Sequence, residues 1–337
     1  MVGNAHPKQF RQRKMILSAI KARKMTGLYQ RPSTSLIRVT GADRLSFIHN
    51  QTTNKIKSLK SGEGCETVFV NSTGRTIDLV TVYVKEDEIL LLTSPEKTQF
   101  LMELMDRYIF PFDKVQIADI SAQYTVLYLI GNESKSILLP LLNEKFLSKH
   151  DHCHSLVKMD EIELTLAMGD GLKLGGYTLI IPQEITNFIK EKLVLDTVKV
   201  LTETEYENLR ILQGKPKVNK ELTEDYNPLE VGLWQTISFD KGCYIGQETI
   251  TRLNTYKGVK QRLWGIEFNE SINFENKQIM SINDEKIGKI TSYLETEKGS
   301  FALGYIRTKA GGEGLEIKVN EIIGKIVDLA YISHPVN

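Results

Sequence analysis

The amino-acid sequence predicts an α+β protein: two ferredoxin-like units, in which antiparallel sheets carry helices, followed by a small C-terminal β-barrel. Three observations support this prediction. Strand and helix patterns follow a split βαβ order over residues 28–118, a second set occupies residues 119–254, and residues 255–337 contain short strands separated by turns. The length of 337 residues also suits two or three domains better than one core.

The first unit is recognised by a hairpin. Residues 65–71 and 76–84 alternate as strands do, and residues 72–75 (STGR) between them are a turn signal. A helix is expected after residues 93–96 (TSPE), because a hydroxyl cap, a proline in the first turn and an acid are typical of a helix start. Further strands are expected at 36–39, 88–92 and 115–117.

The second unit and the barrel follow from the same patterns. Residues 214–234 fit no regular element and are expected to be irregular. Strands are expected at 124–130, 161–168, 172–181 and 198–201, and helices at 133–146, 183–193 and 203–212. The short barrel strands are expected at 262–268, 278–281, 286–294, 300–306, 316–319 and 323–326.

Composition excludes several classes of protein. Lysine and arginine number 43 against 42 acidic residues, so we expect no large nucleic-acid-binding face. No apolar run approaches the roughly 18 residues that span a bilayer, so no membrane association is expected. The cysteines Cys65, Cys153 and Cys243 are few and odd in number, which favours a reducing, intracellular location. An iron–sulphur cluster usually needs four thiolates, so no permanently bound metal is predicted.

The N-terminal segment, residues 1–27, is basic and free of acidic residues. Organelle transit peptides share this pattern, which would place a soluble protein in an organelle matrix. The alternative is the solvated leader of a bacterial protein, which would be cytoplasmic.

Residues 241–248 (KGCYIGQE) concentrate the reactive groups of the chain. Glycines allow a sharp turn around Cys243, and a nearby cation, Lys241, would lower the thiol pKa and favour a reactive thiolate. The alternative interpretation is a turn with a small buried cysteine. We predict Cys243 as the catalytic group, assisted by Lys241, Gln247 and Glu248, in a loop shaped by Gly242, Tyr244, Gly246 and Arg252.

This octapeptide is similar to the signature of the folate-binding family related to the glycine-cleavage T-protein. The family includes a bacterial tRNA-modifying and iron–sulphur accessory factor with its mitochondrial and plastid relatives. Residues 37–54, 71–75 and 209–230 resemble further family blocks in the same order. Residues 107–113 (RYIFPFD) and 248–250 (ETI) resemble the plastid and cyanobacterial branch more than the mitochondrial one.

The resemblance implies a ring-like arrangement of the two ferredoxin-like units and the barrel, with tetrahydrofolate or another reduced folate in the central opening. It also implies an accessory role in the assembly, maintenance or repair of iron–sulphur proteins, with assembly factors or client proteins as partners. The folate contacts it suggests are Asn71, Asp78, Arg210 and Glu221, each of which could equally be a turn, capping or surface residue. If residues 1–27 are a targeting segment, the resemblance favours the chloroplast stroma over the mitochondrion.

Two alternative functions remain open. The first is aminomethyl transfer to tetrahydrofolate, which needs a carboxylate beside the folate nitrogen. T-proteins carry two adjacent acids at the hairpin, whereas here Leu79 follows Asp78, and the acidic T-protein motif is absent near Gly176-Tyr177. These departures favour the accessory role and leave enzymatic activity uncertain. The second alternative is an interaction module that binds no folate.

Two other motifs are interpreted as structural. Residues 150–154 (HDHCH) contain zinc-type ligands, but five adjacent residues rarely surround one tetrahedral ion, so we interpret them as a solvated polar loop. The glycine-rich residues 168–176 join two expected strands and precede no helix, so a hairpin turn is preferred over a phosphate-binding loop.

Overall fold

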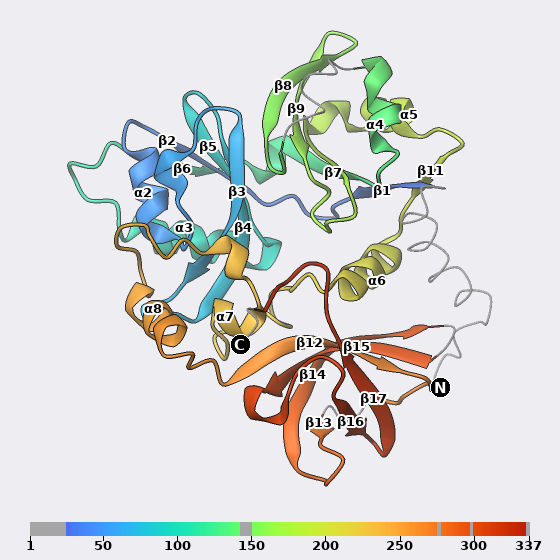
Figure 1. Ribbon diagram of the computed structural model, residues 1–337. Coiled ribbons are helices and arrows are strands. Elements are labelled where there is room, and N and C mark those ends of the chain that lie inside the picture. The colour runs from blue at the N-terminus through green and yellow to red at the C-terminus, as the bar shows by residue number, and fades with distance from the viewer. Residues whose placement is uncertain (1–24, 142–149, 275–277, 297–298, 335–337) are drawn as a thin grey trace.

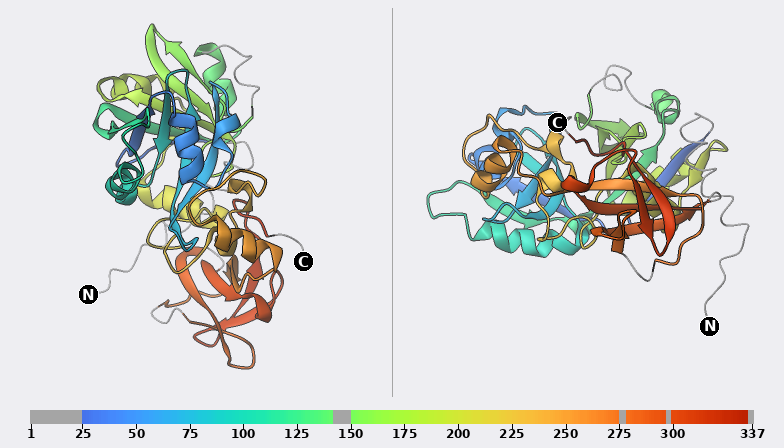
Figure 2. Two further views of the ribbon diagram at one scale, coloured as in Figure 1. Left: turned by 90° about the vertical axis from the view of Figure 1, so that its left-hand side faces the viewer. Right: turned by 60° about the horizontal axis from the view of Figure 1, so that its bottom comes forward.

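The computed structural model describes residues 25–141, 150–274, 278–296 and 299–334. Two sheets with helices lie side by side, and a closed barrel lies below them (Figures 1 and 2). The predicted α+β class with a C-terminal barrel is therefore confirmed. The predicted basic leader at residues 1–27 lies almost entirely outside the described residues.

The first unit is a five-stranded sheet with the strand order β3-β4-β5-β2-β6. Its strands are β2 (Leu36–Thr40), β3 (Glu63–Val70), β4 (Thr76–Val84), β5 (Glu88–Leu92) and β6 (Gln116–Asp119), and its longer helices are α2 (Arg44–Gln51) and α3 (Thr98–Asp106). The short helices η1 (Ile56–Ser58) and η2 (Pro95–Lys97) complete it. The predicted β3–β4 hairpin is present, with Gly74 at a φ of 74° in its turn, a conformation that glycine adopts without strain.

The second unit is a six-stranded sheet with the order β11-β1-β7-β10-β9-β8. Its strands are β1 (Thr26–Gln30), β7 (Tyr124–Ile130), β8 (His154–Met159), β9 (Ile162–Met168), β10 (Gly176–Pro182) and β11 (Val198–Val200). Its helices are α4 (Ser134–Leu138) and α5 (Thr186–Leu193), with the short helices η3 (Ser121–Gln123), η4 (Leu139–Leu141) and η6 (Gln183–Ile185).

Two expectations for these sheets need correction. The strand β1 pairs with β7 and β11, so residues 28–30 belong to the second sheet rather than to the first unit. The predicted solvated loop at residues 150–154 ends in β8, where His154 is buried with its ring against the edge of Tyr83. Pairing with β9 removes this part of the segment from water.

A helical segment joins the second sheet to the barrel. It contains α6 (Glu203–Gln213), α7 (Pro228–Val231), η7 (Trp234–Thr236) and α8 (Gln247–Thr255). The helix α6 begins with a capping box between Thr202 and Glu205 and ends at Gly214 in the left-handed conformation. The helix α7 lies in the stretch that was expected to be irregular, and a second capping box starts it at Asn227.

The barrel consists of six strands. They are β12 (Gln261–Phe268), β13 (Gln278–Met280), β14 (Lys286–Thr296), β15 (Gly299–Arg307), β16 (Glu316–Val319) and β17 (Ile322–Val327), with the short helix η8 (Thr308–Ala310) after β15. They close in the order β12-β15-β14-β13-β16-β17. These bounds agree with the six predicted strands. None of the helices in the described part of the chain is long and apolar enough to cross a membrane.

Shared hydrophobic cores hold the units together. One core contains side chains from both sheets, including Leu90 from the first and Tyr128 from the second. A second core joins Val68 of the first sheet to Leu229 of the helical segment and Leu303 of the barrel. Burial of apolar area at these junctions contributes about 25 cal/mol of stabilising free energy per Å², and it holds the two sheets, the helical segment and the barrel together.

Candidate functional site

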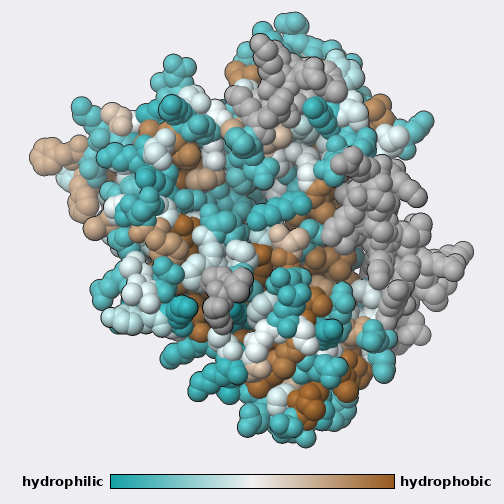
Figure 3. Space-filling model, in the orientation of Figure 1, coloured by the Kyte–Doolittle hydropathy of each residue, from teal (hydrophilic) through white to brown (hydrophobic). Residues whose placement is uncertain are grey.

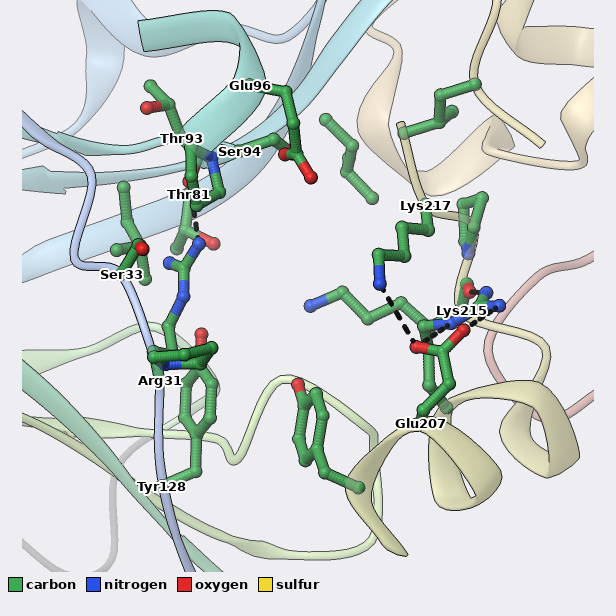
Figure 4. A pocket seen from close by; sticks show the side chains of 18 of the residues that line it. Arg31, Ser33, Thr81, Thr93, Ser94, Glu96, Tyr128, Glu207, Lys215 and Lys217 are labelled. Atoms are coloured by element: carbon green, nitrogen blue, oxygen red, sulfur yellow. Dashed lines mark hydrogen bonds and ion pairs between the residues drawn. The ribbon is translucent and has the colours of Figure 1, made fainter. Parts of the chain in front are cut away.

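A cavity of about 340 Å³ lies where the two sheets and the helical segment meet. Its walls include Arg31, which follows β1, Ser94 between β5 and η2, and Glu207 on α6. Figure 4 shows Arg31, Thr93 and Ser94 on one side of the cavity and Glu207, Lys215 and Lys217 on the opposite side. A cavity of this size at a junction of units is a typical place for a small organic ligand.

Three tyrosines form one wall of this cavity. The rings of Tyr29 and Tyr206 stack with centroids 3.9 Å apart and an interplanar angle of 4°, and Tyr128 lies parallel to both. Burial raises the pKa of Tyr29 to about 12, so its hydroxyl stays protonated near neutral pH. The wall thus combines flat apolar surface with hydroxyl groups that donate and accept hydrogen bonds.

Charged side chains of both signs surround the cavity. Arg31 donates to the Thr93 carbonyl at 2.9 Å, which holds its guanidinium at the wall. On the opposite side, Glu207 pairs with Arg210 at 2.9 Å and with Lys217 at 3.4 Å. The Nζ of Lys215 lies 5.5 Å from the centroid of the Tyr331 ring. The cavity therefore offers cations and carboxylates in one enclosed space.

A buried carboxylate, Asp170, lies beside this wall in the loop between β9 and β10. Its Oδ1 accepts the N–H groups of Leu172 at 2.8 Å and Leu174 at 3.3 Å. Among the described residues, Oδ2 has no hydrogen-bond partner although it is buried. Burial raises the pKa of Asp170 to about 6, while these N–H groups and the charge of Lys215 act in the opposite direction. An unpaired buried acceptor is costly unless a ligand supplies a donor.

The four predicted folate contacts do not gather in this cavity. Asn71 is at the tip of the β3–β4 hairpin, where its Oδ1 accepts from Thr73 and Arg75 and its amide donates to Glu224. Asp78 is fully buried and accepts both the N–H and the hydroxyl of Ser94, at 2.8 and 2.7 Å. Both are structural in this geometry, because their hydrogen bonds are made within the protein.

Arg210 and Glu221 form a buried ion pair. Arg210 Nη1 lies 3.1 Å from Glu221 Oε2, and Glu221 also accepts hydroxyl groups of Thr291 and Ser292 at 2.6 Å each. Arg210 lines the cavity, but its guanidinium is already paired with Glu207 and Glu221. The pair fastens α6 to the barrel strand β14, and this geometry gives no direct support to the prediction that Arg210 and Glu221 contact a folate.

The octapeptide lies outside the cavity, against the first unit. Lys241 is buried, and its Nζ donates to the carbonyls of Thr52 at 2.6 Å, of Asn54 at 2.8 Å and of His49. Its charge is therefore committed to the turn after α2, and its geometry gives no support to activation of the Cys243 thiol. The Cys243 side chain is exposed, so the alternative of a buried structural cysteine is wrong.

The rest of the octapeptide forms a tight turn and the start of α8. Gly246 has a φ of 78° and packs against the β3–β4 turn, where an added Cβ would lie 2.6 Å from the Asn71 carbonyl. Tyr244 is buried, and the Lys241 ammonium lies 4.8 Å from its ring centroid. Gly242 makes no comparable close approach, since a Cβ there would meet nothing within 4 Å.

The predicted helpers of Cys243 point elsewhere. Gln247, Glu248 and Arg252 lie along one face of α8 with Tyr256. Within the described residues, their side chains make no hydrogen bond or ion pair, so no contact supports the predicted assistance of Cys243 by Gln247 and Glu248 or the predicted shaping of the loop by Arg252. In the same described part of the chain, no group of three or more histidine, cysteine or acidic side chains could hold a metal ion.

Among the residues that line the cavity, sequence reasoning identified only Arg210 as a candidate ligand contact. Tyr29 and Tyr206 are far apart in the chain and carry no motif. Asp170 was visible as an acid between two glycines, but it was assigned to a hairpin turn. The signal that could have identified Asp170 is its position between two apolar strands, because a polar side chain buried there needs hydrogen-bond partners.

Comparison with known proteins gives the same fold. The model of the family described as the GCVT N-terminal domain matches residues 1–241 of this chain. A chloroplastic protein of Arabidopsis thaliana with a provisional transferase name is 38% identical over 304 residues, which is 89% of this chain and 70% of that protein. An aminomethyltransferase of Caldanaerobacter subterraneus subsp. tengcongensis is 27% identical over 329 residues, 94% of this chain and 86% of that protein.

Among solved structures, the glycine cleavage system aminomethyltransferase T from Bartonella henselae superposes with a TM-score of 0.81. The match covers 94% of this chain and 90% of that chain at 17% sequence identity. At this identity the likeness shows a common fold of sheets and barrel.

Proposed function

Because the chain belongs to the family of the GCVT N-terminal domain, we propose that it binds a reduced folate, tetrahydrofolate, in the central cavity and serves the assembly, maintenance or repair of iron–sulphur proteins through the Cys243 loop. The observation that carries the folate part is the buried Asp170 carboxylate with its unpaired oxygen beside the cavity. Among the described residues this oxygen accepts no hydrogen bond, and an N–H group of a bound ligand could donate one to it.

The described residues suit the chemistry of a reduced folate. The pterin ring is flat and has adjacent N–H donors, which match a carboxylate such as Asp170 and an aromatic wall such as Tyr206. The glutamate tail carries carboxylates, which match Arg31, Lys215 and Lys217 at the walls. When bound, the folate would supply one-carbon chemistry, and these residues would hold and orient it.

The thiol part of the proposal rests on the anchored octapeptide. Lys241 holds the loop to α2, and Cys243 is the exposed one among the three cysteines. The cavity and the hollow around Cys243 share no lining residue. A folate and a partner protein could therefore be bound at the same time.

Calorimetric titration with tetrahydrofolate under reducing conditions tests the folate part. We expect binding by the wild type and at least tenfold weaker binding by Asp170→Asn, because the amide replaces an acceptor by a donor. Asp160→Asn, in an exposed position paired with Lys192, is the control and should bind normally. Absence of binding by the wild type would remove folate from the proposal.

Complementation tests the thiol part. In a strain that lacks the corresponding accessory protein, the wild type should restore the activity of an iron–sulphur enzyme, whereas Cys243→Ala should not. Because Cys243 is exposed, this change should leave the unfolding midpoint unaltered. Full restoration by Cys243→Ala would contradict a role for the thiol.

Aminomethyl transfer to tetrahydrofolate is the second candidate. It is favoured by the relatives that are named aminomethyltransferases and by Glu66 and Asp170, two buried carboxylates at or beside the cavity. Formation of methylene-tetrahydrofolate from an aminomethyl-lipoyl carrier would establish it, and no turnover would remove it.

A location in the chloroplast stroma is part of the proposal. It is supported by the chloroplastic relative and by the basic composition of residues 1–27. A fluorescent fusion to the C-terminus should enter isolated chloroplasts, and the same fusion without residues 1–27 should not.

A further inference from the structure

The molecule has a second hollow on the outer face of the first unit. It is a groove of about 760 Å³ between α2 and the loop that joins α3 to β6. Its lining includes Gln51 from the helix, Tyr108 and Phe110 from the loop, and Cys243 from the octapeptide. We name it the thiol groove.

A buried, unsatisfied amide lies in this groove. Gln51 is only 5% exposed, and its Oε1 accepts no hydrogen bond from any residue that the structure describes. A desolvated amide oxygen without a donor is costly, and most such atoms in folded proteins are paired. The groove is therefore ready to accept an N–H group from outside the chain, which is an observation independent of the thiol.

The charged residues that line the groove in the described part of the chain are all acidic. Its lining includes the carboxylates of Asp43 and Asp113, and none of its described lining residues is lysine, arginine or histidine. Asp43 accepts the Lys114 N–H with one oxygen, at 2.9 Å, and Asp113 accepts the Phe110 N–H at 2.8 Å. Each carboxylate keeps acceptor capacity, so the groove favours cationic over anionic occupants.

The rim of the groove is aromatic and protrudes. Phe110 is 62% exposed, and Phe112, two residues further along the same loop, is 95% exposed. Figure 3 shows apolar side chains projecting at the left edge of the molecule, where Figure 1 shows this loop. A small molecule in the groove would leave Phe112 in water, whereas a protein surface could cover it. Exposed aromatic residues beside a pocket are typical of protein-binding sites.

We propose that the thiol groove binds a positively charged, cysteine-bearing segment of a partner protein. This inference rests on the proposed function and deepens it, because it states which part of a client protein meets Cys243: a cysteine segment with basic flanks. The aromatic rim packs on the segment, Gln51 accepts one of its N–H groups, and Asp43 and Asp113 attract its basic side chains. Its sulphur then lies next to that of Cys243.

A thiol-exchange assay on the full chain tests this inference. Cys153→Ser serves as background, since Cys65 is partly buried and burial raises its thiol pKa to about 12. Cys243 is first converted to a mixed disulfide with a coloured thionitrobenzoate. A probe thiolate then attacks the Cys243 sulphur, a new S–S bond forms, and the thionitrobenzoate leaves as a thiolate with the bonding electron pair.

The probes are acetyl-Arg-Leu-Cys-Arg-amide and its anionic counterpart acetyl-Glu-Leu-Cys-Glu-amide. Each rate is divided by the rate of the same probe with the corresponding disulfide of acetyl-cysteine amide, which removes intrinsic differences in reactivity. We expect the cationic probe to react about fivefold faster than the anionic probe after this correction. Equal corrected rates would overturn the proposal.

Matched variants locate the recognition. Phe110→Ala should lower the corrected rate of the cationic probe about threefold, and Gln51→Met should lower it by a similar factor. Tyr256→Ala, an exposed aromatic residue outside the groove, should leave it unchanged. An unchanged rate for Phe110→Ala refutes the groove even if Gln51→Met proves unstable.

Failure of this assay is distinguishable from failure of the proposed function, because the assay uses neither folate nor complementation. If the charge preference is absent while folate binds and Cys243 is needed for complementation, the groove alone is refuted. If Cys243→Ala complements fully, the thiol function itself is refuted, whatever the probe rates.

Discussion

Replacing Glu221 by glutamine should loosen the junction between α6 and the barrel. The Glu221 carboxylate is completely buried and accepts four hydrogen bonds. Arg210 Nη1 and the Lys217 N–H approach Oε2 at 3.1 Å each, while the Thr291 and Ser292 hydroxyl groups approach Oε1 at 2.6 Å each. The change keeps the shape of the side chain and removes its charge.

The expected cost follows from these contacts. An amide nitrogen in place of Oε2 would face two donors, and Arg210 would lose one of its two carboxylate partners. Removing one member of a buried ion pair costs about 3–5 kcal/mol. Because Glu207 remains 2.9 Å from Arg210 and the amide oxygen still accepts the hydroxyl groups, we expect about 3 kcal/mol. At about 2–4 °C per kcal/mol, the melting temperature should fall by about 6–12 °C.

Scanning calorimetry measures this fall, and amide hydrogen exchange at β14 shows whether the barrel junction opens first. Glu224→Gln is the control, since Glu224 is exposed on the same segment and pairs with Asn71. A loss below 1 kcal/mol would refute the structural role. Weaker folate binding at unchanged stability would, in addition, restore Glu221 as a folate contact.

Three further predictions concern single residues. Because burial raises the pKa of Asp170 to about 6, above the unfolded value of about 3.9, ionised Asp170 costs stability above pH 6 and this cost disappears as the pH falls towards 4. Asp170→Asn should therefore raise the unfolding free energy at pH 7 by up to about 3 kcal/mol, with a smaller gain at pH 4, as measured by urea titration at both pH values. Lys241→Met should cost about 2–4 kcal/mol and increase proteolytic cleavage near residue 243, because three carbonyl groups lose their donor; unchanged cleavage would contradict the anchoring role. Gly246→Ala should cost more than about 2 kcal/mol because of its positive φ and the 2.6 Å approach to Asn71, whereas Gly242→Ala should be nearly neutral, and similar losses for both would be inconsistent with the loop geometry.

Local patterns predicted most of the fold. The β3–β4 hairpin follows from alternation and from a turn that needs glycine at its positive φ. The barrel strands follow from short apolar runs between turns. In contrast, β1 was not predicted. Its place in the second sheet depends on pairing with β11, which joins Thr26 to Val198, and no local pattern encodes a contact between segments so far apart in the sequence.

The site was harder to predict because burial and pairing are tertiary properties. Arg210 and Glu221 attracted a functional interpretation as charged residues in a family block, but each satisfies the other inside the protein. Lys241 is close to Cys243 in sequence, yet its ammonium reaches the turn after α2. Asp170 has a simple turn signal around it, and what marks it as unusual is its second carboxylate oxygen, which has no hydrogen-bond partner among the described residues.

The position of β1 has a consequence for synthesis on the ribosome. This strand leaves the exit tunnel early, but its neighbours β7 and β11 end at Ile130 and Val200. At about 5–20 residues per second, the nascent strand waits on the order of 10–30 s for its last partner. During that time the first sheet can fold while the N-terminal strand stays unpaired. A circular permutant that moves residues 26–30 behind β11 should remove this delay.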